Sequence, residues 1–114
     1  MLGVDIVETA RIERAAQNKR FVEKTFTAGE REYFEKKNGA YESLAGFWCV
    51  KEAVAKALGS GIRFALTDVE TSHDASGKPI AVLSGKAKEL LGNRCVEISV
   101  SHTSTTAVAV AIIL

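Results

Sequence analysis

Two charged residues in an otherwise apolar segment, Glu52 and Lys56, are the first candidates for chemistry in this sequence. The segment Phe47–Gly61 reads F-W-C-V-K-E-A-V-A-K-A-L-G-S-G, which predicts a mostly apolar helix ending at a glycine loop. The spacing places the acid and the base one turn apart, where an exposed pair stabilises a helix by about 0.2–0.5 kcal/mol. Between apolar flanks we expect both charges to be partly buried. They then need further partners, such as a divalent cation and a phosphate.

The glycine loop Gly59-Ser60-Gly61 has two interpretations. It is first a C-cap, because glycine adopts the left-handed conformation that ends many helices. It is also a place where backbone NH groups can approach a phosphate. The lysine and the spacing of a Walker-type P-loop are absent, so that class of nucleotide site is excluded.

An acid near the N-terminus, Asp5, and a histidine near the C-terminus, His102, are further candidates. Asp5 interrupts an apolar run and is either a capping or ion-paired acid at a strand end or a functional residue. His102, within Ser101-His102-Thr103, either belongs to a capped turn or contacts a phosphate or transfers a proton. No G-x-S-x-G elbow accompanies it, which argues against a Ser/His/Asp hydrolase. We expect His73, beside a hairpin, to be structural.

A basic surface is predicted between residues 11 and 24. It is either a plain solvated face or a docking site for an acidic protein partner. The aromatic residues that interleave with basic ones in nucleic-acid platforms are missing here. The surface consists of Arg11, Arg14, Lys19, Arg20 and Lys24, against Glu13 and Glu23.

Alternating helical and extended patterns predict the elements that must position these residues. The T-A-G-E run at Thr27 has capping-box spacing, with Tyr33 and Phe34 as buried anchors of its helix. Ser84 is expected to cap a later helix. Helices are predicted at Glu8–Ala16, Thr27–Lys37, Tyr41–Leu58 and Ser84–Leu91, with a short amphipathic piece at Phe21–Phe26. Strands are predicted at Leu2–Val7, Leu66–His73, Pro79–Leu83, Val96–Ser101 and Thr106–Leu114.

Chain size and charge restrict the class of protein. A chain of 114 residues fits one domain. A formal net charge of +1 creates no strong overall positive potential that would attract nucleic acid or an anionic membrane. The N-terminus lacks the basic region of a signal peptide, and no apolar run is long enough for a membrane span. Cys49 and Cys95 are expected to be small buried hydrophobes in a reducing cytosol. The last strand is apolar from Ala107 onward, so both faces should be covered, in part by another subunit.

Three motifs together resemble those of the bacterial holo-[acyl-carrier-protein] synthases, the short 4'-phosphopantetheinyl transferases. They are G-V-D-I-V-E-T-A-R-I at Gly3–Ile12, W-C-V-K-E-A-V-A-K-A-L-G-S-G at Trp48–Gly61, and S-H-T at Ser101–Thr103. They occur in order, at proper separations, over nearly the whole chain.

The resemblance implies a single α+β domain over residues 1–114, with a long central helix packed on a mainly antiparallel sheet. It implies a cytoplasmic homotrimer that binds coenzyme A between subunits. Such an enzyme moves 4'-phosphopantetheine to a serine of apo acyl carrier protein, in support of fatty acid biosynthesis. It releases adenosine 3',5'-bisphosphate.

The motif match also implies residue roles. Asp5 and Glu52 would be ligands of Mg²⁺, an ion that prefers oxygen donors. Lys56 would contact the coenzyme A phosphates, and the proton of the attacking serine would pass to Glu52, to a metal-bound water or to His102. The further coenzyme A contacts are expected from Gly59, Ser60, Gly61, His102 and Thr103. Arg11 and Arg14 would meet the carrier protein.

One departure from the family pattern stands in the long helix. Phe47 precedes Trp48 where relatives commonly carry an arginine. If that arginine meets a coenzyme A phosphate, another cation must replace it, and Lys51 and Arg63 are near in sequence. Two other functions fit the same residues: a different metal-dependent enzyme acting on a pyrophosphate or nucleotide, and a module that only binds acyl carrier protein.

Overall fold

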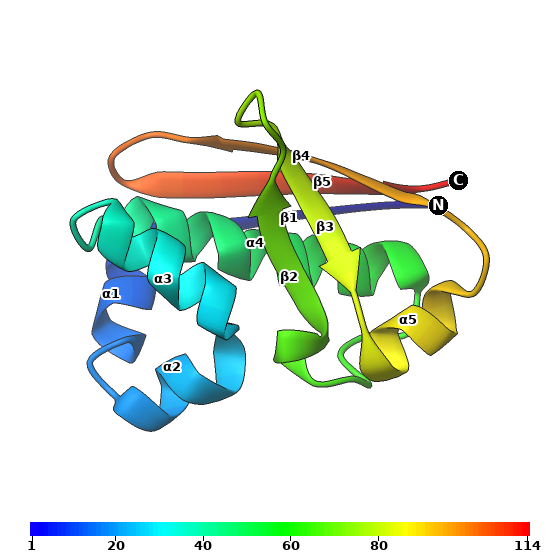
Figure 1. Ribbon diagram of the computed structural model, residues 1–114, viewed down its shortest axis with the longest axis horizontal. Helices are drawn as coiled ribbons and strands as arrows, with labels where there is room; N and C mark the ends of the chain where they lie inside the picture. Colours follow the sequence, from blue (N-terminus) through cyan, green and yellow to red (C-terminus); the bar gives the residue numbers. More distant parts are fainter.

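A long helix lies across one face of a three-stranded antiparallel sheet in the computed structural model, which describes residues 1–114 (Figure 1). The helix is α4 (Tyr41–Leu58), and the sheet has the order β1-β5-β4. Its strands are β1 (Leu2–Glu8), β4 (Val96–His102) and β5 (Thr106–Ile113). This is the predicted α+β architecture, a single small domain with a long central helix on an antiparallel sheet.

The remaining elements surround α4. A two-stranded hairpin joins β2 (Val69–His73) to β3 (Pro79–Leu83). Three short helices cluster near the start of α4, and a fourth lies toward its end (Figure 1). They are α1 (Thr9–Ala15), α2 (Lys19–Thr25), α3 (Ala28–Lys36) and α5 (Gly85–Leu91), and a 3₁₀ turn, η1 (Leu66–Asp68), precedes β2. No helix combines the length and apolar character that a membrane span requires.

Small residues bring α4 close to the sheet. Ala107, Ala109 and Ala111 of β5 alternate toward α4 and are completely buried. On β1, a Cβ added to Gly3 would lie 2.0 Å from the carbonyl oxygen of Ala53. The close approach therefore depends on the absence of a side chain at this glycine.

Helix ends follow the predicted capping signals in two cases. Thr27 and Glu30 form the capping box, with Thr27 Oγ1 accepting from the Glu30 NH at 3.2 Å and Glu30 Oε1 accepting from the Thr27 NH at 3.0 Å. Gly59 ends α4 with a left-handed φ of 73°. The expected buried anchors of α3, Tyr33 and Phe34, are only partly buried, whereas Glu30 has no exposed surface.

Three local predictions were wrong. Residues 66–68 form a 3₁₀ turn instead of the start of a strand. The Ser84 side chain makes no capping bond; the carboxylate of Asp68 instead accepts from the NH groups of Lys86 and Ala87 at 3.0 and 3.4 Å. Cys49 is buried as expected, but Cys95 is exposed.

The sheet has one covered face and one bare face within the chain. The bare face carries three cross-strand apolar pairs: Leu2–Ile112, Val4–Val110 and Ile6–Val108. Leu2, Val4 and Ile6 are 67%, 52% and 66% exposed. A single chain therefore covers one face of the last strand, and the cover of the other face by another subunit stays a prediction.

Candidate active site

Strand β1 delivers Asp5 to the surface of α4. Its alternate residues Gly3, Asp5 and Val7 face the helix, and the close approach at Gly3 lays Asp5 beside the C-terminal half of α4. The Asp5 side chain is only 16% exposed, and its Oδ1 lies 3.3 Å from Lys56 Nζ. Lys56 also donates to the Val4 carbonyl oxygen at 2.9 Å. The lysine thus joins the helix to both the backbone and a side chain of β1.

Glu52, half-buried on α4, completes a pair of carboxylates. Burial raises the pKa of Glu52 above its ordinary value, and the negative charge of Asp5 raises it further. The positive charges of Lys56 and Arg11 oppose this shift. Glu52 and Lys56 do not form the helix-stabilising pair that was one interpretation of their spacing, because Lys56 pairs with Asp5.

The donor set fits a hard divalent cation. Two neighbouring carboxylates that repel each other are relieved by a shared cation, and carboxylate oxygens are the ligands that Mg²⁺ prefers. The chain offers no cluster of three or more His, Cys, Asp and Glu side chains. Water and substrate oxygens would therefore have to complete the coordination, as is usual for Mg²⁺.

Cys49 lies beneath the acids and plays no nucleophilic part. Its Sγ donates to the Ala107 carbonyl oxygen at 3.5 Å, and it has no exposed surface. Burial, followed by the charge of Asp5, raises the pKa of the Cys49 thiol to about 12. The thiol therefore stays protonated at neutral pH.

The glycine loop adjoins this site at the end of α4. Gly59 and Gly61 have φ values of 73° and 64°, so both residues are left-handed, and Ser60 Oγ donates to the Gly61 carbonyl oxygen at 2.7 Å. The Gly59 NH donates to the Lys56 carbonyl oxygen, whereas the NH groups of Ser60 and Gly61 bond to no group of the chain. The C-cap interpretation is confirmed, and two NH groups remain available to an anion.

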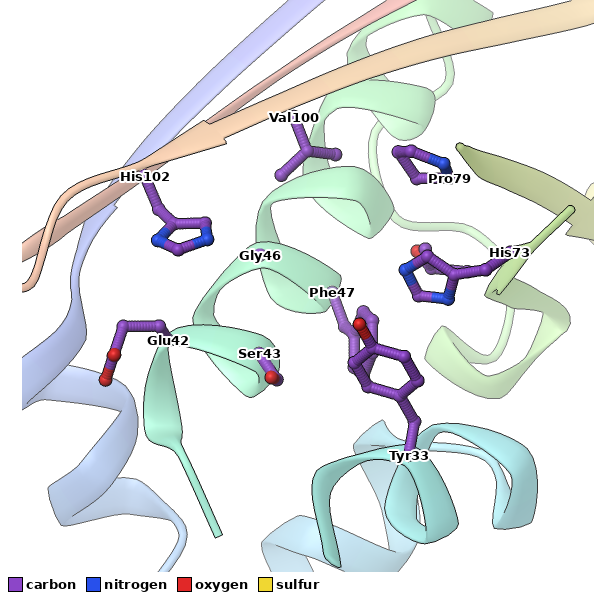
Figure 2. A pocket seen from close by; sticks show the side chains of 10 residues that line it. Tyr33, Glu42, Ser43, Gly46, Phe47, His73, Pro79, Val100 and His102 are labelled. Atoms are coloured by element: carbon purple, nitrogen blue, oxygen red, sulfur yellow. The ribbon is translucent and has the colours of Figure 1, made fainter. Parts of the chain in front are cut away.

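His102 opens onto a different cavity. This cavity, of about 210 Å³, lies between α4, the end of β4 and the β2–β3 hairpin (Figure 2). Glu42, His73 and Phe47 line it together with His102, but Asp5, Glu52 and Lys56 do not. One chain therefore does not bring His102 to the pair of acids.

Aromatic side chains form one wall of the His102 cavity. The rings of Tyr33 and His73 stack with centroids 4.3 Å apart, and Phe47 meets Tyr33 edge-on at 5.6 Å. Burial and the charge of Lys37 lower the pKa of His73, so this ring is neutral near pH 7 and supplies stacking. Thr71 also lines the cavity, and its buried hydroxyl has no hydrogen-bond partner.

Comparison with known proteins decides the family. The family model described as the 4'-phosphopantetheinyl transferase superfamily matches residues 1–112. The chain belongs to this superfamily. The holo-[acyl-carrier-protein] synthase of Ruminiclostridium cellulolyticum is 46% identical over 99% of this chain and 90% of its own length. That of Caldanaerobacter subterraneus is 44% identical over 97% and 91%.

Solved structures agree with this assignment. The Helicobacter pylori holo-[acyl-carrier-protein] synthase in complex with coenzyme A has a TM-score of 0.86 at 31% identity, with full coverage of both chains. A holo-(acyl-carrier-protein) synthase from Bacillus anthracis in complex with CoA (3',5'-ADP) has a TM-score of 0.83 at 34% identity, covering 98% of this chain and 93% of that one. This chain is therefore an enzyme of the holo-[acyl-carrier-protein] synthase type.

The basic face of this enzyme begins beside the acids. Arg11 lies over the Trp48 ring, with its guanidinium carbon 5.8 Å from the ring centroid. Arg11 and Arg14 are exposed and line one groove together with Ile6 and Glu8. Both predicted partner-binding arginines thus share one surface.

Two of the candidate residues already have hydrogen-bond partners within the chain. The Thr103 hydroxyl accepts from the NH groups of Thr105 and Thr106 at 3.2 and 3.1 Å, which orders the β4–β5 turn. Lys51 is completely buried against Glu30, so it cannot replace the missing family arginine, whereas Arg63 is exposed.

The sequence did not predict that Tyr33, Thr71 and His73 line the His102 cavity. These residues lie on elements far apart in the chain, and only their aromatic or polar character could have indicated a shared site.

Proposed function

We propose that this enzyme transfers 4'-phosphopantetheine from coenzyme A to a serine of apo acyl carrier protein in a Mg²⁺-dependent reaction. The observation that carries the proposal is the pair of repelling carboxylates, Asp5 and Glu52, flanked by Lys56 and Arg11. Relatives over nearly the whole chain are holo-[acyl-carrier-protein] synthases. The two products would be the modified carrier protein and adenosine 3',5'-bisphosphate. The reaction would serve fatty acid biosynthesis in the cytoplasm.

Asp5 and Glu52 would hold the Mg²⁺. When bound, the ion neutralises charge on the pyrophosphate of coenzyme A. Lys56 would turn from Asp5 toward a phosphate oxygen and add a second positive charge. The NH groups of Ser60 and Gly61, which bond to no group of the chain, would bind a further phosphate oxygen.

The reaction exchanges one phosphorus–oxygen bond for another. The carrier serine oxygen bonds to the phosphorus that carries pantetheine, and the bond from this phosphorus to the bridging pyrophosphate oxygen breaks. The serine proton requires an acceptor. Glu52 is the candidate acceptor within one chain, because it lies at the acids, whereas His102 opens onto another cavity and would reach the acids only across a subunit interface.

A homotrimer would unite the separated parts of the site. In one chain the His102 cavity does not include the acids, so His102 and Thr103 would serve coenzyme A bound at the acids of a neighbouring subunit. The bare apolar face of the sheet, with Leu2, Val4 and Ile6, supports such an assembly. The exposed Arg63 is the remaining candidate to replace the family arginine at Phe47.

The carrier protein would dock on the basic face. Arg11 and Arg14 border the groove next to the acids, where they would pair with carboxylates of an acidic carrier helix. Such rim charges mainly accelerate association, so transfer should slow at high salt with little change at saturating carrier.

The decisive test is intact mass spectrometry of apo acyl carrier protein incubated with this enzyme, coenzyme A and Mg²⁺. We expect the mass to rise by one phosphopantetheine group. Cleavage of coenzyme A without an acceptor would instead indicate a pyrophosphate hydrolase. Carrier binding with no added mass would indicate a binding module, and either result would overturn the proposal.

A further inference from the structure

A buried ion pair stands directly beside the proposed metal ligand. Lys51, the residue before Glu52, has no exposed side-chain surface, and neither has its partner Glu30. Lys51 Nζ donates to Glu30 Oε1 at 2.8 Å, to the Leu66 carbonyl oxygen at 3.0 Å and to the Val69 carbonyl oxygen at 2.5 Å. All three hydrogens of the ammonium group are therefore used inside the protein.

Glu30 extends this pair to the elements around α4. Its Oε2 accepts from the Thr71 NH on β2 at 2.9 Å, and its Oε1 also accepts from the Thr27 NH at the start of α3 at 3.0 Å. One ammonium and one carboxylate thus join α4 to α3, η1 and β2. Because these groups are buried, water cannot replace any of these hydrogen bonds, so the stability of the junction depends on the positions of its partners.

The junction also closes the glycine loop. Residues 59–65 leave the C-terminal end of α4, and only one backbone hydrogen bond, from the Arg63 NH to the Gly61 carbonyl oxygen, forms within them. The chain then returns to the middle of α4, where Lys51 holds Leu66 and Val69. The loop is therefore held at its start by the α4 C-cap and at its far end by Lys51.

The same residue orients Glu52. Successive side chains of a helix differ by about 100° around its axis. Holding Lys51 against α3 and β2 therefore directs Glu52 toward β1, where the charge of Asp5 acts on it. We propose that Lys51 is a positioning residue, which sets the direction of Glu52 and the place of the glycine loop for the transfer reaction. This inference rests on the proposed function.

A purely structural role makes a different prediction. Removing one member of a buried pair leaves an unpaired charge and destabilises a protein strongly, whereas replacing both members by neutral groups is often tolerated. Stability should therefore be lost when only one of Lys51 and Glu30 is neutralised, and largely kept when both are. If Lys51 positions the site, turnover should instead be lost whenever the ammonium group of Lys51 is removed.

The experiment compares Lys51→Met, Glu30→Gln and the double variant, with Lys88→Met as an exposed control. Thermal unfolding, followed by the fluorescence of Trp48, reports stability. We expect the double variant to unfold closer to wild type than Lys51→Met does, yet to lose at least about tenfold in kcat. Its KM for apo carrier should stay unchanged. Glu30→Gln should lose stability but keep at least about a third of kcat, because Lys51 retains Leu66 and Val69.

Calorimetric titration with coenzyme A and Mg²⁺ provides a readout besides turnover. The double variant should bind coenzyme A about tenfold more weakly than wild type and Lys88→Met. If kcat instead follows stability across the variants, or if the folded double variant matches wild type, Lys51 has no positioning role. If the double variant does not fold, the two single variants decide. An equal loss of kcat in Glu30→Gln and Lys51→Met would show that Lys51 has no positioning role. Retention of kcat in Glu30→Gln alone would support the proposal. Absence of transfer by the wild type would count against the proposed function alone.

Discussion

The ammonium group of Lys56 lies 3.3 Å from the carboxylate of Asp5, and it joins α4 to a strand 51 residues earlier in the chain. The neighbouring carboxylate of Glu52 gains no such bond. Its pKa is raised because it is half-buried and near Asp5. The two acids therefore differ: Asp5 has a cation within ion-pair distance, whereas Glu52 has none.

Replacing one acid by its amide should separate activity from stability. Asp5→Asn relieves the repulsion with Glu52 and loses a partly exposed ion pair, so the free energy of unfolding without Mg²⁺ should change by less than about 1 kcal/mol. The rate of transfer should fall by about 100-fold or more, because a proposed metal ligand is lost. Thermal unfolding and carrier mass spectrometry measure the two effects. Glu89→Gln, an exposed carboxylate on α5, is the control, and normal turnover by Asp5→Asn would remove Asp5 from the metal site.

Lys56→Met should weaken coenzyme A binding with little loss of stability. The Lys56 side chain is 54% exposed, so its pair with Asp5 contributes less than about 1 kcal/mol. A charge-assisted bond to a phosphate is worth about 1.5–3 kcal/mol, which corresponds to roughly 10- to 100-fold in affinity. Calorimetric titration of coenzyme A measures this loss, with Lys88→Met as the matched lysine control. An unchanged affinity would show that Lys56 does not meet the phosphates.

Gly3→Ala should destabilise the protein by about 3 kcal/mol or more. The new Cβ would lie 2.0 Å from the Ala53 carbonyl oxygen and would push β1 away from α4. Chemical denaturation measures the change. The control is Gly46→Ala, whose Cβ would lie 3.4 Å from a Val100 methyl group, and which should be neutral or up to about 1 kcal/mol stabilising within the helix. Equal stability of the two variants would contradict the close approach of strand and helix.

Val4→Lys should break the proposed trimer without unfolding the chain. Val4 is 52% exposed in one chain, so a lysine is tolerated there, but three copies of the charge would be buried in an assembly. Sedimentation equilibrium should show monomers, and far-UV circular dichroism should stay unchanged. Val82→Lys, at a similarly exposed position of 46% on β3, should leave the assembly intact. A Val4→Lys trimer would move the interface elsewhere.

His73 should make the protein less stable in mild acid. Its pKa is lowered in the folded state by burial and Lys37, and Asp74 only partly opposes this shift. Below the unfolded pKa of about 6.5 the unfolded chain binds more protons, so the stabilising contribution of neutral His73 is present above that pH and is lost as the pH falls. His73→Phe keeps an aromatic ring beside Tyr33 and should reduce the fall in Tm between about pH 7.5 and pH 5. Identical pH profiles for the two proteins would refute this assignment.

The sequence alone determined the elements whose signals lie within a few residues. The apolar periodicity predicted α4 with its bounds at Tyr41 and Leu58, and the T-A-G-E run predicted the capping box at Thr27. The motifs also indicated the family and the pair Asp5 and Glu52 as candidates. Such signals are readable because periodicity and capping depend on neighbours along the chain.

Only the tertiary structure decided which charge meets which. Lys56 pairs with Asp5 instead of Glu52, and Lys51 is buried against Glu30, 21 residues earlier. Asp68, which was expected to lie in a strand, caps α5. Each of these outcomes depends on how closely elements distant in sequence approach one another. The alanines of β5 and the absent side chain of Gly3 set that approach, which no local pattern of residues encodes.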